Sequence, residues 1–348
     1  MIRNAIACLV SCCVVSVSQA QWWNPNDVTN PKDRGQPWAP KIEYNSRVFN
    51  DAQRETQRTL NEGDFEKLER MNSEFLAGPM RTTDGRWMTQ AIQDGFDAWA
   101  TRWSEPQILK TLADWKEKVP SSRLRPVAEA VAWQRLAWKE RGGGYSASVT
   151  PEGGDLFKER LRKAAAVLNA SAGTGKESPI WYWVALIVAG SSGRPATQFD
   201  ALFNEAASRF PTYLPLYLTR VNYLLPQWGG DYDQVDDFVE LAVKRTQATE
   251  GRSFYALIYR DLVSKHVGDD FFAETRVTWP GMRDSFDDLT KRYPGITNFL
   301  SYAAFACLAR DRETTARLLS GISPDYDLAG FAGNVTSFGC RRFAFERS

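Results

Sequence analysis

The sequence predicts an all-α protein, an α-solenoid-like array of antiparallel helix pairs that follows an extended N-terminal arm. Apolar residues recur at spacings of three and four from Val48 onward, as in helices with a buried face. Arg209-Phe210-Pro211 returns as Arg292-Tyr293-Pro294, and the offset of 83 residues is about two helix-pair units of roughly forty. Three acid-x-acid segments each follow a helical pattern and can cap the next helix: Asp64-Phe65-Glu66, Asp231-Tyr232-Asp233 and Asp311-Arg312-Glu313.

The N-terminus is typical of an export signal. Arg3 precedes an apolar stretch at residues 5–17, and Ser18-Gln19-Ala20 fits a small-x-small cleavage site, so residues 1–20 are expected to be a signal peptide. The apolar stretch is shorter than an ordinary membrane span, and we expect no transmembrane span in the mature chain. The expected location is therefore periplasmic or secreted. In the alternative, Leu9-Val10-Ser11-Cys12 serves as a lipobox and the protein is lipid-anchored at Cys12.

An arm and a first helical region come next. Residues 21–45 are rich in Pro, Asn and Asp and carry isolated tryptophans, which predicts an extended arm. The N-terminal helical region spans residues 46–141. It opens with two stretches of helical apolar periodicity, which Glu62-Gly63-Asp64 separates and Gly78-Pro79 ends. This pattern predicts a helical hairpin. A turn at residues 81–87 and three further helical patterns complete the region.

The second helical region begins after a Gly/Ser-rich stretch. Residues 142–154 have no apolar period, so we expect a loop that divides the two halves of the chain. The C-terminal helical-repeat region spans residues 155–348. Its clearest unit lies at residues 211–232, where a helix is followed by Pro226 and then by Gly229-Gly230, which allow the chain to reverse.

Stacked helix pairs carry ligands on their exposed helical surface, and two groups of residues are candidates for such a surface. The first group lies in the 211–232 unit and consists of Tyr217, Arg220, Tyr223 and Trp228. The second group lies in the 81–87 turn and consists of Arg86 and Trp87. The alternative interpretation, in which the aromatic residues of the 211–232 unit are core packing, remains open.

Composition excludes several classes of function. The chain has 348 residues and a formal net charge of +1, with 43 basic and 42 acidic residues, so neither nucleic acid nor an anionic lipid surface is an expected partner. His266 is the single histidine, which excludes a multi-histidine metal site, and we expect no metal or other cofactor. Thirteen tryptophans indicate an ordered protein with large buried side chains.

Two cysteines are expected to be paired. Removal of residues 1–20 leaves only Cys307 and Cys340. Cys307 lies on a predicted helix and Cys340 lies in the tail, so a disulfide formed in an oxidising compartment would fix the C-terminus to the last repeat. The alternative is a pair of buried thiols.

No catalytic residue can be assigned from motifs. Residues 170–177 imitate a phosphate-binding loop but lack its first glycine and its hydroxyl residue, and they follow a helix where a strand is required. The acids that begin at Asp231 lack the glycine and glutamate of an EF-hand loop. A Ser-His-acid triad would have to use His266, and no nucleophile motif accompanies it.

Two resemblances support the helical prediction. Residues 301–319 resemble a degenerate tetratricopeptide-type unit, with small alanines where two helices would cross. The export signal occurs together with three motifs: Asp84-Gly85-Arg86-Trp87, Leu225-Pro226-Gln227-Trp228-Gly229-Gly230 and Ala306-Cys307. This combination is similar to a bacterial exported family known only as a domain of unknown function, over roughly residues 48–345. The resemblance implies a helical fold and no assigned activity.

The expected function is that of an exported helical-repeat protein, a protein- or peptide-binding or scaffold module whose partner is a protein or peptide of the cell envelope. The alternative is a hydrolase of cell-envelope polymer on a helical scaffold, which needs two or more carboxylates that converge in a pocket. An inhibitor or immunity-like protein is a third option. The sequence favours binding over catalysis and leaves the ligand and the oligomeric state open.

Overall fold

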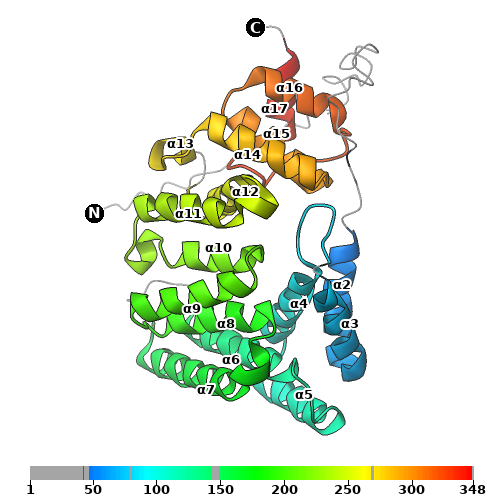
Figure 1. Cartoon of the computed structure of the whole chain (residues 1–348), viewed down its shortest axis with the longest axis vertical. Coiled ribbons are helices and arrows are strands. Elements are labelled where there is room, and N and C mark those ends of the chain that lie inside the picture. The colour runs from blue at the N-terminus through cyan, green and yellow to red at the C-terminus, as the bar shows by residue number, and fades with distance from the viewer. Residues whose placement is uncertain (1–41, 43–46, 79, 143–148, 268–269, 347–348) are drawn as a thin grey trace, which may run out of the picture. The chain divides into compact units, whose positions relative to one another are not determined.

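The structure, a computed structural model, describes residues 42, 47–78, 80–142, 149–267 and 270–346 (Figure 1). The predicted signal peptide, the lipobox at Cys12 and almost all of the expected arm lie outside the described residues. Within the described residues every regular element is a helix, apart from one isolated bridge between Arg81 and Trp87. The predicted all-α fold class is confirmed.

The helices of the N-terminal half are α2 (Arg47–Glu62), α3 (Phe65–Ala77), α4 (Met88–Arg102), α5 (Glu105–Lys118), α6 (Arg125–Arg141) and α7 (Pro151–Gly175). The helices of the C-terminal half are α8 (Pro179–Ser191), α9 (Ala196–Arg209), α10 (Leu214–Asn222), α11 (Tyr232–Glu250), α12 (Ser253–Leu262), α13 (Phe271–Glu274), α14 (Trp279–Arg292), α15 (Ile296–Leu308), α16 (Arg312–Gly321) and α17 (Ser337–Phe345). Two short elements complete the C-terminal half, the 3₁₀ turn η3 (Pro226–Trp228) and the π-helical turn η4 (Val263–Val267).

Residues 40–348 form one compact unit in which helices that are near in sequence pack on one another. The pairs α6 with α7, α8 with α9, α11 with α12 and α15 with α16 are in contact, as Figure 1 shows. Helix α7 begins at Pro151, inside the expected 142–154 loop, because the Thr150 side chain caps it by accepting a hydrogen bond from the backbone N–H of Gly153. The two predicted helical regions therefore meet in the α6–α7 pair.

The 83-residue sequence repeat has a structural counterpart. Helices α9 and α14 start 83 residues apart and end 83 residues apart. Each buries a phenylalanine against a tyrosine of the helix that follows. Phe203 meets Tyr217 edge-on at a ring-centroid distance of 5.4 Å, and Phe286 stacks on Tyr302 at 5.0 Å. The segments α9–α11 and α14–α16 are therefore two versions of one helical unit.

The acidic helix starts are N-caps, as predicted. Asp64 precedes α3, Asp231 precedes α11 and Asp311 precedes α16, and the side chain of each accepts a hydrogen bond from the backbone N–H three residues further on. Each cap satisfies one of the free donors of a helix N-terminus and typically contributes about 1 kcal/mol. The acid-x-acid pattern thus marks the places where the chain reverses into a new helix.

The last helix is attached covalently. Cys307 of α15 and Cys340 of α17 form a disulfide, as the sequence predicted. The bond closes a loop with a sequence separation of 33 residues and contributes on the order of 3 kcal/mol by restricting the unfolded chain. Among the described helices, none combines the length and the apolar character needed to cross a bilayer.

Candidate functional site

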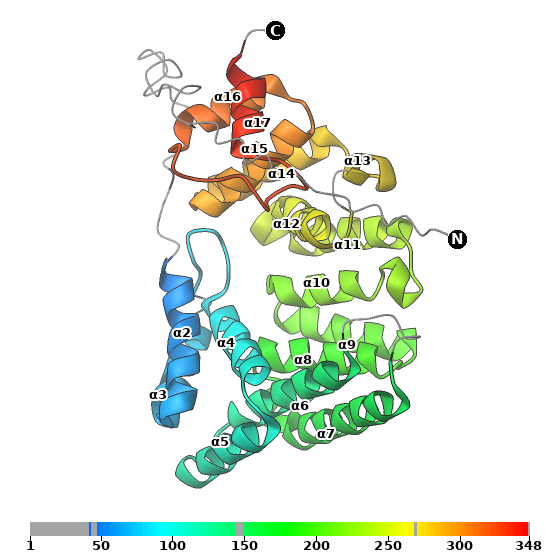
Figure 2. The same cartoon turned by 180° about the vertical axis from the view of Figure 1, so that it is seen from behind.

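A cleft with a volume of about 1180 Å³ is bordered by α4, α6, α8 and α10, together with η3, the start of α11, the end of α12 and η4. Figure 2 shows α4 beside α6 and α8, in agreement with their contacts. The aromatic side chains that line the cleft are Trp138, Trp183, Tyr223, Trp228 and Tyr232. Its amide side chains are Gln90, Gln93, Gln134, Asn222 and Gln227. Its charged side chains are Asp94, Arg135, Arg141, Asp261 and Lys265.

The η3 turn places an aromatic ring at the cleft. Gly229 has a φ of 87°, and a Cβ on Gly230 would collide with the carbonyl oxygen of Leu224, so both positions of the turn require glycine. The turn holds Trp228 with 37% of its surface exposed. Its ring lies at a centroid distance of 5.0 Å from Tyr223 and 6.0 Å from Trp138. The ring orientation is therefore fixed before any ligand arrives.

Tyr223 supports this arrangement from α10. Its hydroxyl donates to the carbonyl oxygen of Ile187 at 3.0 Å and lies 2.9 Å from the hydroxyl of Ser191, which anchors the ring to α8. Burial raises the pKa of Tyr223 to about 12, so the hydroxyl stays protonated. A Cβ at Gly190 would collide with the same ring, and the absence of a side chain there lets the helices approach.

The opposite wall is polar and comes from α4 and α6. Gln93 and Asp94 face the cleft from α4, and Gln134 and Arg135 face it from α6. An ion pair between Arg135 and Asp97 joins the two helices. Polar residues on neighbouring turns of two packed helices thus form a continuous surface, which we call the α4–α6 wall.

Asp94 is the carboxyl of this wall with the most perturbed environment. Burial raises the pKa of Asp94 to about 6, and the negative charge of Asp97 acts in the same direction. The positive charges of Arg86 and Arg135 oppose this shift only in part. Among the described residues, the one hydrogen bond that Asp94 accepts comes from Gln93 Nε2 at 3.4 Å.

Gln93 is itself fixed from the neighbouring helix. It is 4% exposed, and its Oε1 accepts a hydrogen bond of 2.8 Å from the hydroxyl of Tyr213. Gln134 is 2% exposed, and its Oε1 has no hydrogen-bond partner within the described structure. A buried oxygen without a partner costs about 1–3 kcal/mol. Gln134 therefore retains an unused acceptor at the edge of the cleft.

The structure separates the candidates of the 211–232 unit. Tyr223 and Trp228 line the cleft. Tyr217 has no exposed surface and donates to the carbonyl oxygen of Pro211 at 2.7 Å, so it lies in the core. Arg220 pairs with Asp200 at 2.9 Å and lies outside the cleft lining. The two interpretations offered by the sequence thus apply to different residues of the 211–232 unit.

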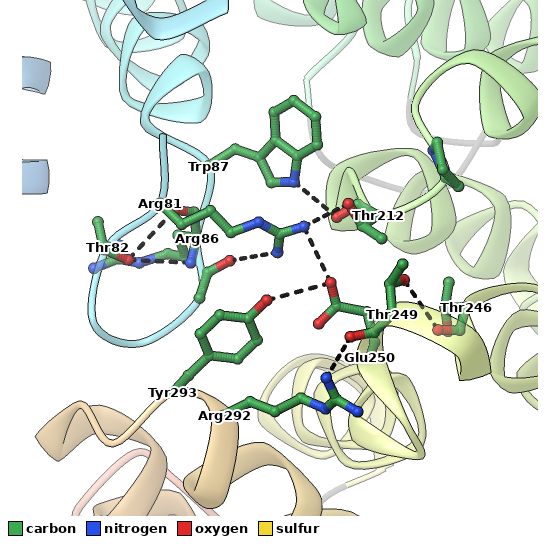
Figure 3. A network of polar contacts seen from close by, with 12 residues as sticks. Arg81, Thr82, Arg86, Trp87, Thr212, Thr246, Thr249, Glu250, Arg292 and Tyr293 are labelled. Carbon is green, nitrogen blue, oxygen red and sulfur yellow. Dashed lines mark hydrogen bonds and ion pairs between the residues drawn. The ribbon is translucent and has the colours of Figure 1, made fainter. Parts of the chain in front are cut away.

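Arg86 and Trp87 belong to the loop at residues 81–87, which contacts distant turns (Figure 3). The guanidinium of Arg86 pairs with Asp84 at 3.2 Å and lies 3.8 Å from the ring centroid of Phe49. The indole N–H of Trp87 donates to the carbonyl oxygen of Thr212 at 3.0 Å. Both side chains are engaged within the protein and do not line the cleft.

Sequence patterns did not single out the residues at the centre of this contact. Arg81 donates to the Thr212 hydroxyl and to Glu250 Oε1, the latter at 3.1 Å, and the hydroxyl of Tyr293 reaches the same oxygen at 3.3 Å (Figure 3). Glu250 is 2% exposed. The backbone N–H of Gly295 also donates to the carbonyl oxygen of Thr83 at 3.0 Å. We call this set of contacts the 81–87 clasp.

Sequence analysis also passed over the α4–α6 wall. A local signal exists, because Gln93 and Gln134 each interrupt an otherwise apolar helical face. A glutamine at a core position is typical of either an internal hydrogen bond or a ligand contact. In the part of the chain that the structure describes, no group of three or more His, Cys, Asp or Glu side chains is arranged to hold a metal ion.

Comparison with known proteins adds no relative. No family model, no curated protein and no solved structure matches this chain. The expected relationship to a bacterial exported family therefore stays a prediction. The function has to be argued from the cleft and its residues.

Proposed function

We propose that this chain is an exported binding module that holds a segment of a protein or peptide of the cell envelope in the cleft between α4, α6, α8 and α10. The observation that carries the proposal is Trp228, an aromatic ring fixed at the cleft by a turn that requires two glycines. Tryptophan and tyrosine contribute most of the affinity in many protein interfaces, above all when their rings are oriented in advance.

The remaining lining suits a peptide. Side-chain amides such as those of Gln90, Asn222 and Gln227 offer donors and acceptors to a peptide backbone. The cleft volume of about 1180 Å³ exceeds the roughly 300–1,000 Å³ typical of small-molecule pockets, so several residues of an extended chain have room. The disulfide between Cys307 and Cys340 supports an oxidising location, periplasmic or secreted, for the soluble or the lipid-anchored form.

The test is capture of the partner by the mature protein. Wild type, Trp228→Ala and the control Phe338→Ala are each crosslinked mildly in envelope extract of the source cells, and the captured proteins are identified by mass spectrometry. Phe338 is 61% exposed and lies on α17, outside the cleft lining. We expect wild type and Phe338→Ala to capture the same partner and Trp228→Ala to lose it while its circular dichroism stays unchanged. Equal capture by all three proteins contradicts the proposal.

A second candidate function, hydrolysis of a cell-envelope polymer, is favoured by Asp94. A cleft carboxyl whose pKa is raised to about 6 is partly protonated near neutrality, as a general acid requires, and Asp261 provides another carboxyl at the same cleft. The test is release of soluble fragments from purified envelope polymer by wild type and by Asp94→Asn. Hydrolysis requires release by wild type and its loss in the variant.

A further inference from the structure

We propose that the α4–α6 wall of the cleft is a subsite for a protonated primary amine, carried by a lysine side chain or the N-terminus of a bound peptide. The inference rests on the proposed peptide binding and specifies what the ligand must present. It assigns Gln134 and Asp94 as the groups that receive the amine.

Gln134 supplies the first part of the argument. The residue lines the cleft, and its buried Oε1 accepts no hydrogen bond from the described residues. A ligand N–H aimed at this oxygen would remove the cost of the unsatisfied acceptor, whereas an apolar group or an anion would leave it in place. The subsite therefore selects for hydrogen-bond donors.

Asp94 supplies the charge. Its carboxyl lines the same cleft and has no cation within ion-pair distance among the described residues, since the salt bridges of the wall lie elsewhere. Its single hydrogen bond, from Gln93 at 3.4 Å, is a long one. A carboxylate with so few hydrogen-bond partners has free acceptor sites, and a donor that also carries a positive charge binds them most strongly.

The charges around Asp94 leave room for that cation. Arg135 on α6 is paired with Asp97 of α4, and Arg86 from the preceding loop is paired with Asp84. Each arginine facing Asp94 therefore has its own carboxylate. From α10, Tyr213 presents a hydroxyl that is already donated to Gln93. The groups nearest Asp94 therefore carry an acidic excess of one charge, and Arg141, the other cation that α6 brings to the cleft, lies over Trp138.

Aromatic rings border the wall and favour the same ligand. Trp138 lies on α6, one turn beyond Gln134, and Trp183 faces the cleft from α8. Tryptophan faces attract cations and also pack against the methylene chain of a lysine. The ring of Trp138 already lies 5.1 Å from the guanidinium of Arg141, whereas the ring of Trp183 makes no cation contact among the described residues.

Proton linkage gives the subsite a pH signature. The pKa of Asp94 in the free protein is raised to about 6, and only the ionised carboxyl attracts an ammonium. Protonation of Asp94 below pH 6 therefore competes with the ligand, and affinity falls by up to about tenfold for each further pH unit. Above about pH 7 the affinity is constant, because Asp94 is ionised and the amine of lysine remains protonated.

The experiment compares two pentapeptides that differ in one group: Ac-Ala-Ala-Lys-Ala-Ala-NH₂ and the same peptide with norleucine in place of lysine. Each is titrated into ¹⁵N-labelled mature protein, and the side-chain amide signal of Gln134 and the indole signals are followed. At about pH 7.5 we expect the lysine peptide to bind at least about tenfold more tightly, the effect of one charged hydrogen bond. At about pH 5 most of this preference disappears.

Variants separate the subsite from the cleft as a whole. Asp94→Asn and Gln134→Met should each bring the lysine peptide close to the affinity of the norleucine peptide. Gln227→Met, an amide removed from another wall of the cleft, should preserve the lysine preference. Gln134→Met removes a buried polar group without a partner, so the thermal stability of this variant should equal or exceed that of wild type. Asp94→Asn tests the lysine preference in the same way and leaves the protein core unchanged.

The outcomes are distinct. Preference for lysine that depends on Asp94, Gln134 and pH establishes the amine subsite. Equal binding of the two peptides overturns the subsite and leaves the peptide-binding cleft standing. Absence of binding by both peptides at millimolar concentration overturns the subsite and the proposed peptide-binding function together.

Discussion

The units α9–α11 and α14–α16 begin with helices of equal length and differ most in the connection before their last helix. In both, a helix of 14 residues ends in arginine, and an aromatic C-cap and a proline follow. From Arg209 to the cap Asp231 the first unit uses 22 residues, whereas the second uses 19 from Arg292 to Asp311. The helix α10 has 9 residues and α15 has 13, whereas the connection that contains η3, at residues 223–230, is six residues longer than its counterpart at residues 309–310. In the second unit the chain reverses through Arg310 alone, at a φ of 59°.

This difference shows where the unit carries specialised chemistry. The helices keep their buried aromatic pairs in both units, because those pairs hold neighbouring layers together. The connections are free to diverge, because they lie at the surface. One connection fixes Trp228 at the cleft, and the other follows α15, the helix that the disulfide joins to α17.

The largest expected effect comes from the contact that both units share. Arg81 donates hydrogen bonds to Thr212 and to Glu250, both of the first unit. Glu250 also accepts a hydrogen bond from Tyr293 of the second unit. Arg81→Ala leaves the buried carboxylate of Glu250 without its cation and should lower the free energy of unfolding by about 4 kcal/mol. Urea unfolding measures the loss. The double variant Arg81→Met, Glu250→Gln should recover most of it, and a loss below about 1 kcal/mol in Arg81→Ala contradicts the role of the clasp.

Removal of the disulfide acts on the second unit only. Cys307→Ser with Cys340→Ser should lower the free energy of unfolding by about 3 kcal/mol, because the unfolded chain regains the freedom of the closed loop. Thermal unfolding with and without a reductant checks the value, since reduced wild type should match the double variant. Peptide affinity should be unchanged. If the reductant leaves the stability of the wild-type protein unchanged, the disulfide contributes nothing to the free energy of unfolding.

Substitution in the longer connection should affect the first unit. Gly230→Ala forces a Cβ against the carbonyl oxygen of Leu224 and should cost about 2 kcal/mol while displacing Trp228. Near-ultraviolet circular dichroism reports the indole, and chemical unfolding reports the cost. Gly78→Ala is the control, because a Cβ there meets no atom within 4 Å. Equal behaviour of the two variants means that the turn tolerates a side chain.

The smallest effect is expected in the shorter connection. Arg310 occupies a left-handed conformation that costs a non-glycine residue about 1 kcal/mol. Arg310→Gly removes this strain but also removes the contact of the guanidinium with the ring of Phe343, at 5.6 Å. The net change should be a stabilisation below about 1 kcal/mol, measured as a small rise in thermal midpoint. A clear fall in the midpoint would mean that the ring contact outweighs the backbone strain.

Local patterns predicted the features that depend on neighbouring residues. The caps at Asp231 and Asp311, the register of α9 against α14 and the turn before α11 follow from hydrogen bonds and backbone angles within a few positions. The pairing of Cys307 with Cys340 followed from counting, because no other cysteine lies outside the predicted signal peptide.

The cleft depends on packing between segments that are distant in sequence, and patterns did not locate it. Asp94, Gln134 and Trp228 line one cleft only because α4, α6 and α10 all pack against α8. Tyr217 and Tyr223 show that sequence patterns also fail to separate cleft residues from core residues within one segment. Both were candidates of the 211–232 unit, yet Tyr217 is enclosed by phenylalanines of α9, α11 and α12 while Tyr223 reaches the cleft. Whether each tyrosine is buried or lines the cleft depends on which of its sides the neighbouring helices pack against.

The 81–87 clasp also has a consequence for the order of folding. Synthesis delivers the chain from its N-terminus, so the loop emerges long before Tyr293 and Asn298, and the bond from Asn298 to the carbonyl oxygen of Asp84 spans 214 positions. An open helical array can consolidate layer by layer as it appears. Here the first third of the protein stays incomplete until the last third arrives. The finished molecule should therefore unfold as one cooperative unit rather than unravel from an end.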